Sequence, residues 1–221
     1  MKKLKKIFHA GVCCLGAFIL TACGGFDAEG YTRAVLDHMF QGETEALAAY
    51  AGEAGNKQLE DEYEDYIAAF SESLTEGLNA SEGMEEKFNV LCQEIFRSVR
   101  YDVKGVEKKS SEAYLVSVEI EPVDVFVRWK ALLEENAGEV SEKAERGEYQ
   151  GTEEEQMQMM LADITAQSYE LLDTAYREAS YGDTETVVLT ISKDEKGRFV
   201  PDDDEISNLV MKILCLDVIQ G

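Results

Sequence analysis

The amino-acid sequence predicts an α+β fold in which several helices pack on an antiparallel sheet made from two β-hairpins. Two observations support this prediction. Apolar residues recur every three or four positions, as in amphipathic helices, through most of the chain after residue 26. The spacing changes to every second residue only around residues 101–121 and 184–200. Helices and hairpins that do not alternate strictly are typical of α+β proteins.

Four helices are predicted before the first hairpin, over residues 27–40, 44–50, 58–79 and 84–99. Asp27 is placed to cap the first helix, because its carboxylate can accept hydrogen bonds from the free N–H groups of the first turn. Gly42 interrupts the pattern, and residues 52–56 form a second break. The third helix carries one apolar stripe, made of Tyr63, Tyr66, Ile67, Phe70, Leu74 and Leu78.

The first hairpin, over residues 101–121, has one buried face and ends at Pro122. A helix over 125–140 is expected next, with Trp129 on its inner side as a core residue; the alternative is a platform for stacking sugars. Residues 142–152 are charged and contain glycine, and we expect them to form a surface connection.

A long helix is predicted over residues 153–180, because acidic residues suit the first turn of a helix. Its apolar stripe consists of Met157, Leu161, Ile164, Leu171, Leu172 and Ala175. The second hairpin has a tight turn at 194–197 and ends at Pro201. Asp202–Asp204 then cap a last helix.

Residues 1–22 are predicted to be a lipoprotein signal peptide. Four lysines precede an apolar run from Ala10 to Leu20, which is too short to span a bilayer. Leu20, Thr21, Ala22 and Cys23 then form a lipobox, the site at which a bacterial lipoprotein is cleaved and acylated. The alternative is an ordinary secretory leader in which Cys23 is an incidental thiol.

Acylation of Cys23 would place the protein on the extracytoplasmic face of the bacterial cell membrane. A diacylglycerol on the thiol supplies two fatty acyl chains, such as palmitate, and two chains give stable anchoring. Residues 23–26 would be a short acylated tether, and residues 27–221 a single α+β domain. The short tether predicts that this domain sits close to the bilayer.

The mature chain is strongly acidic. Residues 1–22 carry four Lys and no acid, so their removal changes the formal net charge from −24 to −28. Such a charge argues against nucleic-acid binding and is expected to repel anionic lipid. The membrane, through the lipid anchor, and a cationic peptide or protein are the partners that the sequence favours.

The Cys-Gly-Gly lipobox and the Phe26-Asp27-Ala28-Glu29-Gly30-Tyr31 segment resemble a group of uncharacterised lipoproteins from Gram-positive bacteria, in which a Phe-Asp-x-x-x-Tyr helix start follows the lipobox. The resemblance extends over most of the mature chain through short, mostly structural motifs. It implies an α+β domain similar in shape to the cystatin or nuclear-transport-factor folds. The group has no established activity, so the resemblance implies no catalytic residue.

Sequence patterns for common catalytic and metal sites are missing. His38 is the one histidine after the leader and is predicted to lie at the boundary of its helix's apolar side. No zinc spacing occurs, and the acidic runs 60–62 and 202–205 lack the calcium-loop pattern, so no metal is expected. Cys92 and Cys215 are expected to be core thiols, with a disulfide between them as the alternative. No cofactor is predicted apart from the covalent diacylglycerol.

Three functions are compatible with these features. The favoured one is a non-enzymatic binding or scaffolding module held at the membrane, with a cationic or protein partner. The second is an envelope hydrolase that uses two carboxylates about 5 to 9.5 Å apart. The third is a small solute- or calcium-binding lipoprotein. Acidic residues are too numerous for the sequence alone to select a catalytic pair.

Overall fold

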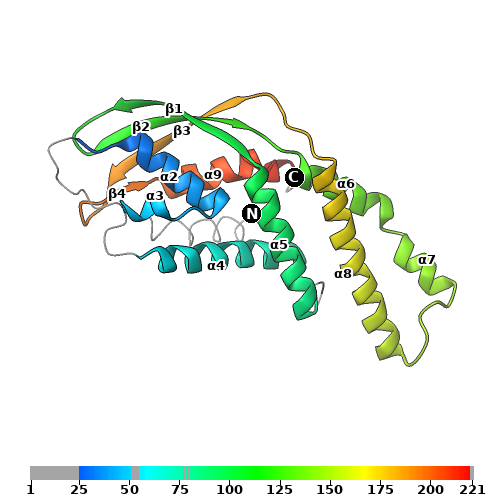
Figure 1. Cartoon of the computed structure of the whole chain (residues 1–221). Helices are drawn as coiled ribbons and strands as arrows, with labels where there is room; N and C mark the ends of the chain where they lie inside the picture. Colours follow the sequence, from blue (N-terminus) through cyan, green and yellow to red (C-terminus); the bar gives the residue numbers. More distant parts are fainter. Residues whose placement is uncertain (1–24, 51–54, 77, 79, 220–221) are drawn as a thin grey trace.

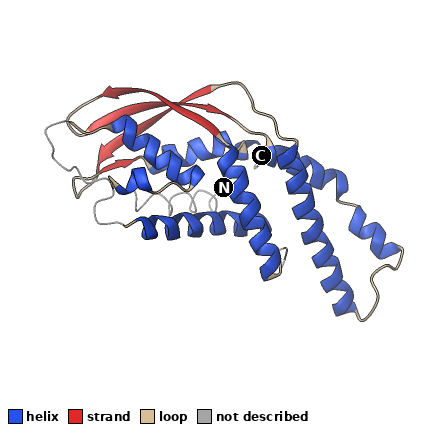
Figure 2. Ribbon diagram, in the orientation of Figure 1, coloured by secondary structure: helices blue, strands red, loops and turns tan. Residues whose placement is uncertain are grey.

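The computed structural model describes residues 25–50, 55–76, 78 and 80–219. These residues form a four-stranded antiparallel sheet with helices packed against one of its faces (Figure 1). Helix is the dominant secondary structure, and all the strands belong to the one sheet among these residues (Figure 2). The predicted α+β fold is therefore confirmed.

The strands are β1 Arg100–Lys108, β2 Ala113–Glu121, β3 Glu185–Lys193 and β4 Phe199–Pro201. They are neighbours in chain order, and each pair is antiparallel. Both predicted hairpins are present, and the pairing of β2 with β3 joins them into one sheet. Val116 lies opposite Leu189 in this pairing, and both side chains are fully buried beneath the sheet.

The helices are α2 Ala28–Gln41, α3 Glu45–Ala48, α4 Asn56–Thr75, α5 Glu82–Ser98, α6 Val125–Asn136, α7 Glu139–Glu145, α8 Glu153–Arg177, α9 Asp203–Ile213 and α10 Leu216–Ile219. Helices α2 and α9 contact the sheet directly, and α4 and α5 pack against each other. Helices α7 and α8 project away from the sheet as an arm (Figure 1). Helix α4 ends at Thr75, earlier than the predicted Asn79.

The predicted cap of α2 is present, and further caps define other helix ends. The Asp27 side chain accepts a hydrogen bond from the backbone N–H of Gly30 at 2.9 Å. Thr152 and Glu155 form a reciprocal capping box at the start of α8. Gly42 ends α2 with φ at 75°, a left-handed conformation that glycine adopts without steric cost.

Aromatic rings fill the centre of the core. Phe96 of α5 is completely buried and lies with ring centroids 4.9 Å from Phe70, 5.6 Å from Tyr66 and 6.0 Å from Phe40. Trp129 is also buried, and its indole N–H donates to a backbone carbonyl of α8 at 3.0 Å. Trp129 is thus a core residue, as predicted, and not a sugar platform.

The segment 125–152 differs from the prediction. The expected helix over 125–140 is divided into α6 and α7 by a turn at Ala137 and Gly138, and α7 continues to Glu145 inside the predicted surface connection. Val140 is the reason, because its side chain is buried although its neighbours are charged. Burial of Val140 and i,i+4 pairs of opposite charge, such as Glu142 with Arg146, stabilise helix α7 where the composition indicated a loop.

The predicted inward face of α8 is wrong at its N-terminal end. Met157 is 63% exposed, and Met159 is also exposed. Full burial begins only at Thr165, because the first part of α8 belongs to the arm and extends past the core (Figure 1). The helical periodicity is correct here, but no neighbour among the described residues covers Met157.

The predicted signal peptide, residues 1–22, and the lipidation site Cys23 lie outside the described residues. Phe26, assigned to the tether by the sequence, packs against the folded domain with its ring 4.0 Å from that of Phe199.

Cys92 and Cys215 are both free thiols, and burial raises the pKa of Cys92 to about 12. Cys92 is therefore an inert core thiol at neutral pH.

Candidate functional site

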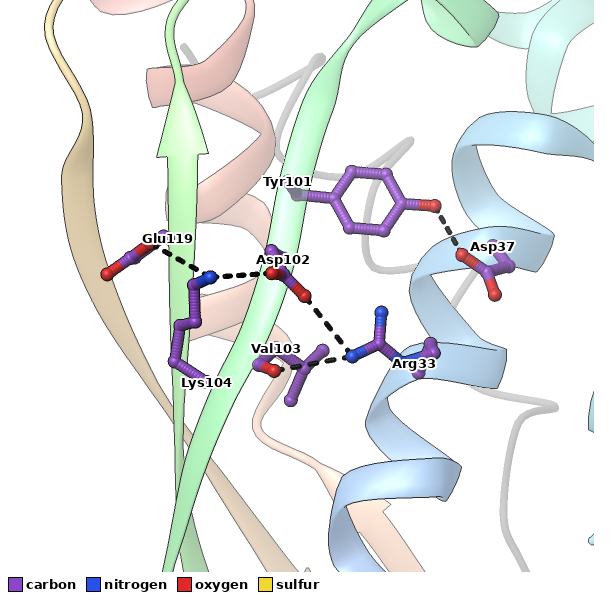
Figure 3. Close-up of polar contacts among 7 residues, drawn as sticks. All are labelled: Arg33, Asp37, Tyr101, Asp102, Val103, Lys104 and Glu119. Atoms are coloured by element: carbon purple, nitrogen blue, oxygen red, sulfur yellow. Dashed lines mark hydrogen bonds and ion pairs between the residues drawn. The ribbon is translucent and has the colours of Figure 1, made fainter.

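A polar network joins α2 to the edge strand β1 (Figure 3). The Tyr101 hydroxyl donates to the Asp37 carboxylate at 2.6 Å. Arg33 donates to the Asp102 carboxylate at 3.2 Å and to the Val103 carbonyl at 3.3 Å. The contact with Val103 satisfies a carbonyl on the unpaired side of the edge strand, so this network shields the edge of the sheet.

A β-bulge at Lys104 extends the same network. The pairing of β1 with β2 shifts between Val103 and Gly105, which leaves Lys104 without a partner residue on β2. The Lys104 ammonium lies 2.7 Å from Asp102 and 3.5 Å from Glu119. Hydrogen bonds from Lys104 and then Arg33 lower the pKa of Asp102. Arg33 and Lys104 are thus both paired with carboxylates, as expected of a structural network.

We expect Tyr101→Phe to lower the free energy of unfolding by about 1.5 kcal/mol, because a hydrogen bond to a charged group is lost. Burial, and then the Asp37 contact, raise the pKa of Tyr101, so its hydroxyl remains a donor at all pH values of interest. Urea unfolding measures the change. Tyr149→Phe removes a similar bond to Asp163 near the α7–α8 arm, away from the sheet edge, and is the matched control. An equal effect of the two substitutions would contradict the role given to Tyr101.

A small pocket lies between α2 and α4. It is lined by His38, Met39, Glu62, Tyr63 and Tyr66. The sequence predicts His38 at the boundary of the apolar side of its helix. In the structure its side chain is buried, with 4% exposed, because α4 packs over this side of α2. Neither His38 Nδ1 nor Glu62 Oε2 has a hydrogen-bond partner among the described residues. The cavity, about 10 Å³, is the size of one water molecule and cannot hold an organic ligand.

Burial lowers the pKa of His38 below its usual 6.5, while the Glu62 carboxylate and a backbone hydrogen bond with Glu43 act in the opposite direction. The unfolded chain therefore binds a proton near pH 6 more readily than the folded chain. Stability from neutral His38 is present above pH 6.5 and is lost as the pH falls below this value.

We expect the free energy of unfolding to fall by up to about 1 kcal/mol between pH 7 and pH 5.5, and His38→Gln to remove this part of the pH dependence. Urea unfolding of both proteins at each pH measures it. Carboxylates titrate mainly below this range, and they are the same in both proteins. An unchanged slope in the variant would show that His38 does not cause the pH dependence.

A larger concave site is a groove between α4 and α5. Its volume is about 420 Å³, within the range of sites that take small molecules or side chains. Small residues form its floor, namely Ala68, Ala69, Ser71 and Thr75. Three carboxylates line it, from Asp65 and Glu72 on α4 and from Glu85 on α5, and Asn89 completes the lining.

Helical spacing explains how these groups meet. Asp65 and Glu72 are seven residues apart, so they lie two turns apart on the same side of α4. Ala68 and Ala69 lie between them and are too small to fill the space beside α5. Within the described part of the chain, none of the three carboxylates forms an ion pair. The groove, named the α4–α5 groove below, is therefore an uncompensated negative cleft.

The chemistry of this cleft favours binding of a cation over catalysis. All three carboxylates are exposed to solvent, whereas a general acid needs a carboxyl that burial keeps protonated. Asp163, outside the groove, is also unsuited to act as a general acid, because hydrogen bonds from Tyr149 and then Lys143 lower its pKa. No group of three or more His, Cys, Asp or Glu side chains in the described chain has the geometry of a metal site.

The sequence did not select the groove carboxylates. Asp65, Glu72 and Glu85 look like any other acids on the outer sides of amphipathic helices, and the run of small residues 68, 69 and 71 was the one signal that could have marked the groove. The acidic run 202–205 serves the fold: Asp202 caps α9, and Glu205 hydrogen-bonds Thr190 in β3. It is a helix start, as predicted.

Comparison with known proteins finds a similar fold but no family. No family model matches the chain, and no curated protein sequence matches it. One similar solved structure is the crystal structure of a "putative lipoprotein (ycdA)" from Bacillus subtilis, with a TM-score of 0.51 and 12% identity. The similarity covers 85% of this chain but 55% of the ycdA chain, so this chain spans about half of that protein. At this identity the similarity concerns the fold.

None of the helices among the described residues is both long enough and apolar enough to cross a bilayer.

Proposed function

We propose that this chain is a membrane-anchored extracytoplasmic lipoprotein, and that it acts as a non-enzymatic binding module for a cationic partner. The anchor is the predicted diacylglycerol on Cys23. The α4–α5 groove would receive an ammonium or guanidinium group of a peptide or protein. The lipoprotein part is supported by the lipobox pattern, and the similarity of fold to the ycdA protein is compatible with it.

The observation that carries the binding role is the concave arrangement of Asp65, Glu72 and Glu85 without cationic partners in the described chain. An isolated exposed carboxylate binds a cation weakly, because water screens the attraction. Three carboxylates around one groove can act on the same cation while the groove walls exclude part of the water. A lysine or arginine side chain has the size and charge that this space accepts.

Thermal unfolding of residues 24–221 with a lysine-rich peptide, an arginine-rich peptide and calcium tests the proposal. At 100 times its dissociation constant, a ligand of the folded state stabilises it by about 2.7 kcal/mol. For a domain of this size the melting temperature should rise by several degrees. We expect this rise with one of the peptides.

The variant Asp65→Asn, Glu72→Gln, Glu85→Gln should abolish the rise. The matched control, Glu134→Gln, Glu135→Gln, Glu154→Gln, removes the same charge from exposed positions outside the groove and should keep it. Equal loss in both variants would mean that the peptides sense only the overall charge. A rise with calcium alone would favour the alternative of a calcium-binding lipoprotein.

A further inference from the structure

Phe26 fixes the place where the chain leaves the folded domain toward Cys23. Its ring stacks on Phe199 at 4.0 Å and contacts Tyr114 at 5.6 Å and Tyr31 at 5.3 Å. Cys23 precedes Phe26 by three residues, so an extended chain separates them by at most about 11 Å. The acylated end must therefore lie close to this aromatic cluster, whatever path the intervening residues take.

Both hairpin turns lie at the same end of the molecule. Tyr114 directly follows the turn between β1 and β2, and Phe199 follows the turn between β3 and β4. The Lys193 N–H donates to the Glu112 carbonyl at 3.0 Å, which joins the two turns. Figure 1 shows these turns beside the start of α2, whereas the α7–α8 arm projects at the opposite end. An anchor at Cys23 thus brings the turns to the membrane.

The two turns hold a cluster of basic residues. The basic residues are Lys108, Lys109, Lys193, Lys196 and Arg198, which we call the hairpin-tip surface. The acidic residues of the same turns are Glu107, Glu112, Asp194 and Glu195. The two turns hold five basic and four acidic residues, whereas the whole chain holds 21 basic and 45 acidic ones, and Asp27 and Glu29 at the start of α2 add negative charge beside the turns.

Part of this positive charge is free to act on a partner. Lys109 pairs with Glu107 at 2.7 Å, and Arg198 pairs with Asp194 at 2.7 Å. The other lysines form no ion pair within the described chain. Two of them lie over rings that surround Phe26, Lys108 at 5.7 Å from the centre of Tyr114 and Lys193 at 5.5 Å from that of Phe199. Lys196 is exposed at the tip of its turn.

We infer that the hairpin-tip surface docks on the phosphate headgroups of anionic lipids in the membrane that holds Cys23. The inference rests on the proposed anchor. Basic side chains are attracted to an anionic leaflet only within a screening length of about 8 Å, a distance that the short tether allows. Docking through this end also directs the strongly acidic remainder away from the lipid and orients the arm outward.

The acylated full-length mature protein, reconstituted in vesicles, tests the inference. Vesicles of phosphatidylcholine alone and vesicles that also contain phosphatidylglycerol are compared. Flotation reports the anchor, and labelling of lysines with an amine reagent, read by mass spectrometry, reports contact. We expect Lys108, Lys193 and Lys196 to be protected on the anionic vesicles only, and Lys87 on α5 to be labelled equally on both.

Lys193→Glu with Lys196→Glu should remove the protection of Lys108, since each lysine changes the ratio of docked to undocked protein about fivefold. The control pair, Lys87→Glu with Lys212→Glu, makes the same change of charge away from the turns and should keep the protection. In about 1 M salt, where the screening length is about 3 Å, the protection should disappear.

The outcomes separate the anchor from the surface. Flotation without protection, or equal protection on both kinds of vesicle, would overturn the docking surface and leave the anchor intact. Equal protection of the same lysines by inorganic phosphate in solution would also overturn it, by showing a site for free anions. Protein that does not float would overturn the anchor and, with it, the docking surface.

Discussion

Replacing Cys23 with alanine is expected to move the protein from the membrane fraction to the soluble fraction. Each methylene of a buried acyl chain contributes about 0.8 kcal/mol, so the loss of a diacylglycerol removes nearly all of the affinity for the bilayer. The described helices offer no substitute span. The weak attraction of the hairpin-tip lysines cannot hold a molecule with this net charge.

Fractionation of cells that express each variant, followed by detection of the protein in both fractions, measures this effect. Cys215→Ala is the matched control, because Cys215 is a half-buried free thiol in the folded domain and its replacement should leave the protein at the membrane. Continued membrane attachment of the Cys23→Ala protein would refute the lipobox interpretation.

Phe96→Ala should be the most damaging single substitution in the folded domain, with a loss of about 3–5 kcal/mol in the free energy of unfolding. Its ring is completely buried between Phe40, Tyr66 and Phe70, so its removal leaves a cavity that these rigid neighbours cannot close. Such a loss is a large share of the roughly 5–15 kcal/mol that stabilises a typical domain.

Equilibrium unfolding in urea, followed by circular dichroism, measures the loss. Val90→Ala on the same helix is the control: Val90 is 51% exposed, and its truncation should change the free energy by less than about 0.5 kcal/mol. A similar small change for Phe96→Ala would mean that the aromatic centre of the core is not packed as described.

Local patterns in the sequence were sufficient for most of the secondary structure and for the sign of the overall charge. The caps at Asp27 and Thr152 act between residues three positions apart, so the sequence contains both partners. The alternation in the two hairpins depends on the two-residue repeat of a strand, which is also local. The lipobox is read from consecutive residues, and it remains a prediction because residues 1–24 lie outside the described structure.

Errors arose where burial depends on a distant neighbour. Met157 has the spacing of an inward residue, yet the arm leaves it exposed; His38 has the spacing of a boundary residue, yet α4 covers it. Residues 142–145 belong to helix α7, although their composition indicates a surface connection. Periodicity gives the direction in which a side chain points, but the packing of other elements determines whether anything lies there.

Sequence alone therefore determined the α+β class, the cap at Asp27, the acidic character and the predicted anchor, since each depends on neighbouring residues or on the total composition. Only the tertiary structure brought Asp65, Glu72 and Glu85 around one groove, because the packing of α4 on α5 sets their separation. It also placed lysines of two hairpins beside Phe26. Both candidate sites join residues that are far apart in the chain, and folding alone makes them neighbours.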